Sequence, residues 1–239
     1  MQISEPSDAE LLAEWLGHHR EPAFHALVAR YAGLVHMAAK RTCGDETIAA
    51  EASQLVFILL ARKAKSLASR SSLAGWLHLT AVMQTKNIVR QNRRENHKRQ
   101  LLLSAMENES HNHSGDSWRE MQPVLDDALA ALSEKDREAL LLRFYRSLGI
   151  QEIAITLGIA PDAAQKRIER ATERLRGKLA RRGCQVGGTL GAVMLAGFAT
   201  DVQAAAPSVS LLTSKAVAGS GVLTTKSTLI TILALKTTA

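Results

Sequence analysis

Polar and basic side chains on one predicted helix are the residues of this chain best suited to contact DNA. Within residues 161–175, four apolar residues recur with the spacing i, i+4, i+7 and i+11, which predicts one buried stripe along a helix. These residues are Ala164, Ile168, Ala171 and Leu175. Four polar or basic residues then lie on or near the open face: Gln165, Lys166, Arg170 and Arg174. Because such side chains bind phosphates and base edges, the pattern predicts a recognition helix.

A second helix is predicted directly before this one. Ile153, Ala154 and Leu157 would form its buried face. Gly158 supplies a tight turn, and Pro161 suits the first turn of the helix that follows. Two short helices joined in this way form a helix-turn-helix, whose second helix enters the major groove. The alternative interpretation is an ordinary helical hairpin with a solvated charged face.

A second basic cluster precedes the helix-turn-helix. Residues 86–99 carry six basic side chains against the single acidic Glu95. The basic residues are Lys86, Arg90, Arg93, Arg94, Lys98 and Arg99. The net charge of +7 would equally suit an anionic membrane surface, so the distribution of charge has to decide. Two separate clusters indicate two DNA contacts on separate modules; a solvated face is the alternative for each.

Motifs for catalysis or metal binding are missing from the sequence. There is no G-x-x-x-x-G-K-[ST], G-x-S-x-G or H-E-x-x-H motif. Cys43 and Cys184 lack C-x-x-C spacing, and His111 and His113 have no cysteine nearby. We therefore predict a protein that is not an enzyme and that has no catalytic residues, no cofactor and no metal site.

Apolar periodicity predicts an all-α fold. Helices are expected from Asp8 to about His19, from Glu21, after a cap at Asp45, and after a cap at Ser72. No segment alternates with period two over a useful length. We expect two small helical domains, a bundle over residues 8–100 and a helix-turn-helix domain over 124–183. A flexible linker over residues 101–123 would join them, because residues 108–117 have no apolar residue.

The C-terminal segment, residues 184–239, is rich in Ala, Gly, Ser, Thr, Val and Leu. Its longest apolar stretch, residues 186–200, ends at Asp201 and is shorter than the ~20 residues that a membrane-spanning helix needs. Three interpretations stay open: a regulatory tail that binds a membrane-associated partner, a weak membrane-surface anchor, or a low-complexity tail of uncertain order. The first 20 residues do not resemble a signal peptide, which favours a cytoplasmic protein that could attach to membranes through this tail.

These motifs, in this order, resemble those of RNA polymerase sigma factors of the sigma-70 family, extracytoplasmic-function (ECF) type. The first domain shows Phe24, Leu27 and Tyr31, then Gly44 and Asp45, then Gln54, Val56 and Phe57, then Trp76 and Leu77, and then the basic stretch NIVRQNRRENHKR from Asn87. The second shows ALSEKDREALLLRFYRSLGIQEIAITLGIAP, followed by Arg167, Arg170 and Ala171. The resemblance covers residues 8–182, with residues 184–239 as an added extension.

The resemblance implies docking on core RNA polymerase and recognition of a promoter −10 element. Glu51 and Gln54 are implied as polar contacts to the polymerase, and Phe57 is expected in the core. The sequence departs from the family at Ala50 and Leu55, where acidic residues are usual, and at Met83, where relatives often carry Asn. The implied −10 contacts are Lys86, Asn87, Arg90, Arg93 and Arg94. The loop over residues 66–73 matches the loop that captures a flipped base.

The resemblance also implies that the helix-turn-helix reads a promoter −35 element. The contacts would come from Gln165, Lys166, Arg167, Arg170 and Arg174, with Lys135 and Arg137 as further backbone anchors. The implied partners are core RNA polymerase, promoter DNA and, as a further candidate, an anti-sigma protein. We therefore expect an alternative, signal-responsive sigma factor. Two alternatives stay open: a helix-turn-helix regulator that binds duplex DNA alone, and a membrane-associated signalling adaptor that binds neither DNA nor polymerase.

Overall fold

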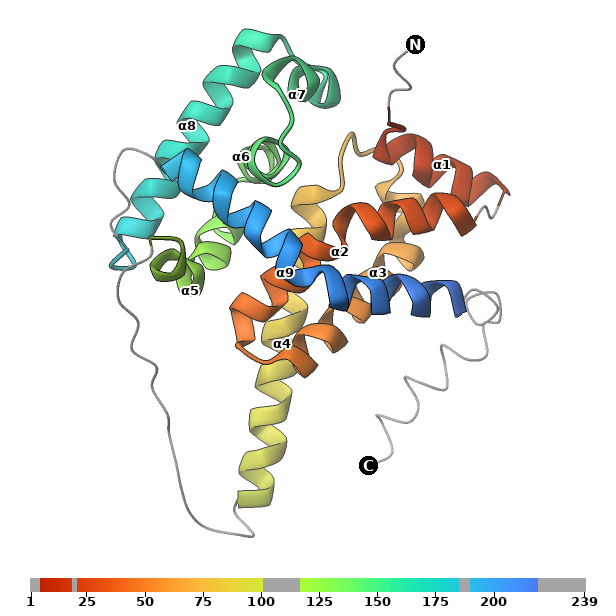
Figure 1. The fold of residues 1–239 in the computed structure, drawn as a ribbon, viewed down its shortest axis with the longest axis vertical. Helices are drawn as coiled ribbons and strands as arrows, with labels where there is room; N and C mark the ends of the chain where they lie inside the picture. Colours follow the sequence, from red (N-terminus) through yellow and green to blue (C-terminus); the bar gives the residue numbers. More distant parts are fainter. Residues whose placement is uncertain (1–4, 19–20, 101–116, 185–189, 219–239) are drawn as a thin grey trace.

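A computed structural model describes residues 5–18, 21–100, 117–184 and 190–218, and every regular element in these ranges is helical (Figure 1). The all-α prediction is therefore confirmed. The elements are α1 (Asp8–His18), α2 (Glu21–Cys43), α3 (Glu46–Leu67), α4 (Ala74–Gln100), α5 (Ser117–Ala130), α6 (Glu134–Leu140), the π-helical turn η1 (Leu141–Tyr145), α7 (Ile150–Leu157), α8 (Pro161–Ala180) and α9 (Leu190–Ala218).

Helix α2 is the centre of the fold. It is buried on nearly every side between Ala23 and Ala39 because α1, α3, α4, α5 and α9 all pack against it. The predicted cap of α3 is confirmed, since the Asp45 carboxylate accepts the Ile48 N–H at 2.8 Å. The predicted cap at Asp8 is wrong: this carboxylate is buried and accepts the Tyr31 hydroxyl at 2.6 Å. The α1 N-terminus instead uses Ser7, whose hydroxyl accepts the Glu10 N–H at 3.3 Å.

The predicted linker over residues 101–123 is too long at its C-terminal end. Residues 101–116 lie outside the described residues, but 117–123 belong to α5. This helix continues through Pro123 because an apolar stripe holds it against the core. The stripe consists of Trp118, Met121, Leu125, Ala128 and Leu129, all buried.

The two predicted domains share one hydrophobic core. The Tyr145 hydroxyl, from η1, is inserted beside the α2 backbone, where it donates to the Arg30 carbonyl and accepts the Leu34 N–H, both at 3.1 Å. Burial raises the pKa of Tyr145 to about 12. At the N-terminus of α4, the Gly75 N–H donates to Glu138 of α6 at 2.8 Å. Residues 8–100 and 117–183 therefore pack as one body in this structure.

The C-terminal segment contains a long helix that packs inward. Helix α9 lies across α2 and also contacts α5, η1 and α8 (Figure 1). This packing corresponds to none of the three interpretations drawn from composition. Among the described residues, no helix is long and apolar enough to cross a membrane. Residues 219–239 lie outside the described residues.

Glu138 makes the contact between the two halves sensitive to pH. Its burial raises the pKa to about 7, against the opposing effect of hydrogen bonds from Ser72 and from the Gly75 N–H. The folded protein therefore holds a proton that the unfolded chain releases between about pH 4.5 and 7. The resulting stability is fully present below pH 4.5 and is lost as the pH rises through 7.

Glu138→Gln should remove this loss, because a neutral amide replaces the carboxyl. We expect the free energy of unfolding of the variant, relative to the natural protein, to rise by about 2–3 kcal/mol between pH 5 and pH 8. Urea denaturation followed by circular dichroism at both pH values measures this difference. Glu134→Gln, at an exposed position of the same helix, is the control. An equal pH response of both variants would contradict the assignment.

Candidate nucleic-acid interface

The predicted helix-turn-helix is present as α7 and α8. Between them Gly158 adopts a left-handed conformation, with φ of 63°, which a glycine takes without a steric penalty. The chain then turns into Pro161, the first residue of α8. The Glu152 carboxylate accepts the Gly149 N–H at 2.6 Å and fixes the start of α7. The local sequence therefore sets the angle between the two helices.

The apolar stripe of α8 is buried as predicted, and this orients the polar face outward. Ala164, Ile168, Ala171 and Leu175 are all buried, and α8 packs through them on α6 and α7. The opposite face carries Gln165, Lys166 and Arg170, which are exposed, and Arg167, which is half-buried. The Gln165 amide donates to Glu169 Oε1 at 3.0 Å, one helical turn further on.

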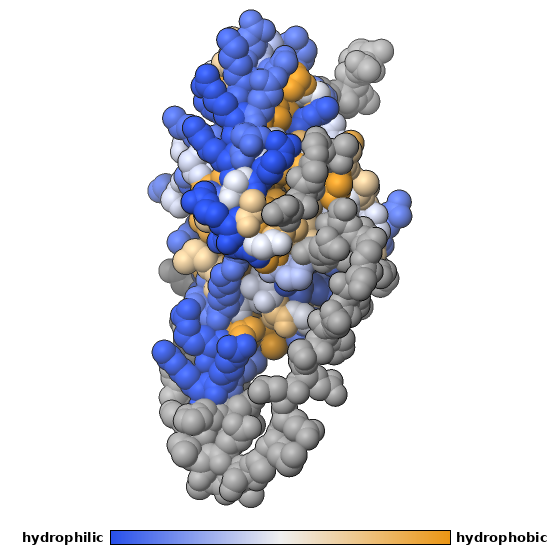
Figure 2. Space-filling view, turned by 90° about the vertical axis from the view of Figure 1, so that its left-hand side faces the viewer, coloured by the Kyte–Doolittle hydropathy of each residue, from blue (hydrophilic) through white to orange (hydrophobic). Residues whose placement is uncertain are grey.

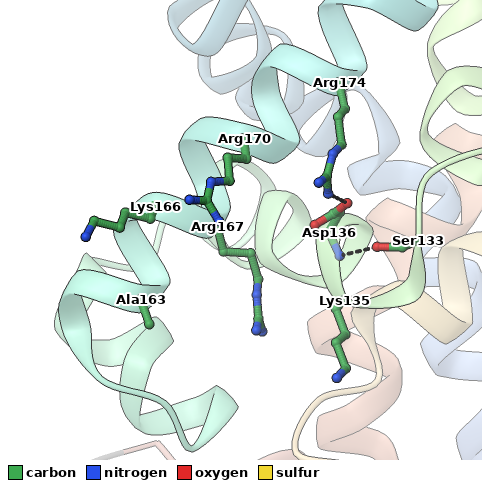
Figure 3. Close-up of a pocket in the computed structure, with 8 residues that line it drawn as sticks. All are labelled: Ser133, Lys135, Asp136, Ala163, Lys166, Arg167, Arg170 and Arg174. Atoms are coloured by element: carbon green, nitrogen blue, oxygen red, sulfur yellow. Dashed lines mark hydrogen bonds and ion pairs between the residues drawn. The ribbon is translucent and has the colours of Figure 1, made fainter.

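An open hollow of about 450 Å³ lies between α8 and the start of α6 (Figure 3). Its lining consists of Ser133, Lys135, Asp136, Ala163, Lys166, Arg167, Arg170 and Arg174. Lys166 and Arg170 extend outward from α8 in Figure 3, whereas Arg167 turns toward α6. Because five cations face one carboxylate, the hollow suits an anionic ligand such as a DNA phosphate.

Two of the predicted −35 residues, Arg174 and Arg137, are held by contacts with other parts of the fold. Arg174 forms an ion pair with Asp136 at 2.6 Å and so ties α8 to α6, although 59% of its side chain is exposed. Arg137 is buried, and its guanidinium donates to the carbonyls of Gly75 (3.1 Å) and Leu132 (3.1 Å). The prediction that Arg137 anchors the DNA backbone is therefore wrong, because a buried side chain cannot reach a phosphate.

The second basic cluster lies on the outer face of α4. Lys86, Asn87, Arg90, Arg93 and Arg94 are all exposed. The inner face of the same stretch is held by the buried Ala81, Val82, Thr85 and Ile88. On the side of the molecule where α8 lies, Figure 2 shows hydrophilic side chains in a vertical band, over α8 above and over the lower end of α4 below. The described part of α4 therefore supplies a cationic, solvent-facing surface.

Lys86 has an acidic partner on another helix. Its ammonium group lies 2.6 Å from Asp127 of α5, in a pair that is nearly half exposed on both sides. Asn87 Oδ1 accepts from Arg90 at 3.4 Å. No spacing in the sequence indicated Asp127, because it lies 41 positions away along the chain.

The residues predicted to contact polymerase lie on α3, a different helix from α4 and α8, which carry the two cationic faces. Glu51 and Gln54 are half-buried, and Phe57 is buried, as expected for a core residue.

Met83 is 54% exposed on α4. In the loop before α4, Arg70 forms an ion pair with Glu134 of α6, and Ser72 and Leu73 are buried. Among the described residues, no group of His, Cys, Asp or Glu could hold a metal ion.

Comparison with known families agrees with this arrangement. Residues 27–95 match the family model "Sigma-70 region 2", and residues 124–175 match "Sigma-70, region 4". Together the two matches span just over half of the chain. The chain belongs to the sigma-70 family. Members of this family are transcription initiation factors that bind DNA and core RNA polymerase, and they are not enzymes.

One solved structure is also similar: the co-crystal structure of the sigma factor RpoE in complex with the anti-sigma factor NepR from Bartonella quintana. The identity is 22%, and the match covers 64% of this chain and 93% of that one, with a TM-score of 0.29. The family assignment depends on the matches to regions 2 and 4. Region 2 corresponds here to α2, α3 and most of α4, and region 4 to α5–α8.

Arg93→Ala should weaken DNA binding by a similar factor for all sequences, because an exposed guanidinium on α4 would hold phosphate. We expect the slope of log K against log salt concentration to become shallower by about one unit. Fluorescence anisotropy with labelled promoter fragments, bound by the protein together with core polymerase, gives both quantities. Arg62→Ala removes another exposed charge, from α3, and should leave the slope unchanged. Equal slopes for both variants would contradict the assigned face.

Proposed function

We propose that this chain is an ECF-type sigma factor that directs core RNA polymerase to promoters with a −10 and a −35 element. Region 4 follows region 2 with only residues 96–123 between the two matches, which leaves no room for a further domain. One cationic helix on each region then contacts one element. As an initiation factor it would act in the cytoplasm. The observation that carries this proposal is the pair of outward cationic helices, α4 and α8, on these two regions.

The chemistry of α8 supports reading of duplex DNA at the −35 element. Its exposed face combines an amide, Gln165, with the guanidinium of Arg170, and these groups can make paired hydrogen bonds to adenine and guanine edges. Lys166 and the hollow beside Arg167 supply phosphate contacts. The start of the helix, which carries these residues, is the part that enters the major groove in helix-turn-helix proteins.

The chemistry of α4 supports binding of a separated strand at the −10 element. A duplex opens only when one strand is held more strongly than by its complement. Arg90, Arg93 and Arg94 can hold the phosphates of such a strand, and Asn87 can pair with a base edge. Met83, which is exposed one turn before Asn87, presents a flexible apolar side chain that can stack on a base. These contacts need no covalent chemistry from the chain itself.

Transcription in vitro with purified core polymerase tests the proposal. We expect the chain to direct initiation at specific start sites and to bind promoter DNA weakly without polymerase. Specific DNA binding without polymerase would instead favour a stand-alone helix-turn-helix regulator. Binding to neither polymerase nor DNA would favour a signalling adaptor. An anti-sigma partner and a stress or other inducing signal remain expectations from the sequence.

Arg170→Ala should relax the preference at one base pair of the −35 element, because Arg170 lies on the exposed face of the recognition helix. The expected loss is about 1–3 kcal/mol of discrimination at that position. Measuring promoter strength over all single substitutions of the −35 element identifies the position. Arg181→Ala, which removes the same charge beyond the end of α8, should lower binding without changing base preference. An unchanged preference in Arg170→Ala would show that another residue reads the element.

A further inference from the structure

Helix α9 has a buried face that spans both DNA-binding regions. Leu190, Met194, Phe198 and Ala205 lie on one side of the helix and are buried, together with Asp201. Leu195 and Val202 flank this buried side and are each 42% exposed, and Val202 lies beside Gly33 of α2. The buried side packs on α2 of region 2 and on α5, η1 and α8 of region 4 (Figure 1). A segment outside both family matches therefore bridges the two regions.

Phe198 is the centre of this contact. Its ring lies 5.4 Å from that of Trp118 and 6.2 Å from that of Tyr145, both in edge-to-face geometry. The Arg41 guanidinium of α2 lies 5.6 Å from the same ring, in a cation–π arrangement. Trp118 and Tyr145 belong to the region 4 half and Arg41 to region 2. One side chain of α9 therefore contacts groups from both regions.

Gly197 and Asp201 of α9 also make close contacts with the two regions. At Gly197 a Cβ atom would collide with the Trp118 indole ring, so only glycine allows this approach. Asp201 forms an ion pair with Arg41, which is buried and also pairs with Asp126 of α5 at 2.7 Å. A buried guanidinium needs such partners, since an unpaired charge in the interior is strongly unfavourable. The Arg41 side chain of region 2 thus binds both Asp126 of region 4 and Asp201 of α9, and so connects the three parts.

The packed arrangement is too short to contact both promoter elements. The −10 and −35 elements lie about 25 base pairs apart, or roughly 85 Å along B-DNA at 3.4 Å per step. Lys86 of the −10 face contacts Asp127, and Arg182, just beyond α8, donates to the Asp127 carbonyl at 3.5 Å. Because α8 is about 30 Å long, the −35 residues lie within about 45 Å of Lys86. Regions 2 and 4 must therefore separate before both contacts can form.

We propose that residues 190–205 of α9 form an intramolecular clamp: the buried side of this helix packs on α2, α5 and η1, and the bound helix holds regions 2 and 4 in a closed state that cannot engage a promoter. The proposal rests on the proposed function. In the closed state Lys86 also pairs with Asp127 of the chain itself in place of a DNA phosphate. Polymerase and promoter bind the open state, so the clamp lowers their apparent affinity by the fraction of molecules that is open.

Energy transfer between labels on the two regions tests the clamp without polymerase. The labels are placed on the exposed positions of Arg62→Cys in α3 and Glu169→Cys in α8, in a full-length chain that carries Cys43→Ser and Cys184→Ser. Phe198→Asp and Gly197→Leu are the test variants. Gly197→Leu raises helix propensity while it blocks the approach to Trp118, so its effect cannot come from loss of the helix. Leu195→Asp, on the exposed side of α9, is the matched control.

We expect lower energy transfer in both test variants, transfer close to that of the natural sequence in Leu195→Asp, and unchanged helical circular dichroism in all three. In transcription with core polymerase, the test variants should show an apparent affinity about tenfold or more higher than that of the natural chain. Asp201→Asn, a milder change at the Arg41 pair, should shift both readings in the same direction and to a smaller extent.

Two outcomes would overturn the clamp: unchanged energy transfer in both test variants, or lower transfer with no gain in affinity for polymerase. A third outcome separates the two proposals. Lower energy transfer in the test variants, with no promoter-directed transcription from any form of the chain, would overturn the proposed function and leave the closing contact of α9 supported.

Discussion

The buried guanidinium of Arg41 determines how the parts of this chain meet. Its carboxylate partners come from helices far apart in the sequence, Asp126 of α5 and Asp201 of α9, and His78 of α4 shares Asp126 at 2.9 Å. Burial by itself would raise the pKa of Asp126, but the Arg41 charge and the hydrogen bonds from His78 and Arg41 outweigh it and lower that pKa. A charge taken out of water requires all of its partners in place. The network therefore specifies one arrangement of regions 2 and 4 and the C-terminal helix.

The same arrangement explains which residues of the two basic clusters face solvent. Helix α8 buries its apolar stripe in the shared core, and α4 buries its stripe partly there and, at Ile88, in a smaller cluster with α2 and α3; this turns their cationic sides outward. The acidic residues of region 4 lie against some of these cations: Asp127 pairs with Lys86, and Asp136 pairs with Arg174. Internal carboxylates thus neutralise part of the positive charge that would otherwise face DNA phosphates, whereas Arg90, Arg93, Arg94 and Arg170 stay exposed.

Local pattern was enough to predict the helices of both regions, the turn at Gly158 and the buried face of α8, because each depends on residues within two turns. It failed at α5, where residues 117–123 were assigned to the linker although the apolar residues there have helical spacing. It also failed at α9, whose apolar residues were weighed only by length against a membrane. The stripe from Leu190 to Ala205 recurs every three or four residues and could have been recognised as a packing face. The roles of Asp127 and Arg137 could not be predicted, since their partners are set by tertiary packing.

The chemistry of the contact between α9 and the two regions bears on whether it can open. A wholly apolar interface of this extent would gain stability with every methylene buried. Here the contact also contains a charged network beside Phe198, whose Coulombic attraction is largely offset by the desolvation of Arg41, Asp126 and Asp201. Opening returns these groups to water, so the net stability of the closed state is smaller than its number of contacts implies. A reversal from 1% to 99% open needs about a 10⁴-fold preference of a ligand for the open state, or about 5.5 kcal/mol. A polymerase and a promoter that bind only the separated regions can supply a preference of that size together.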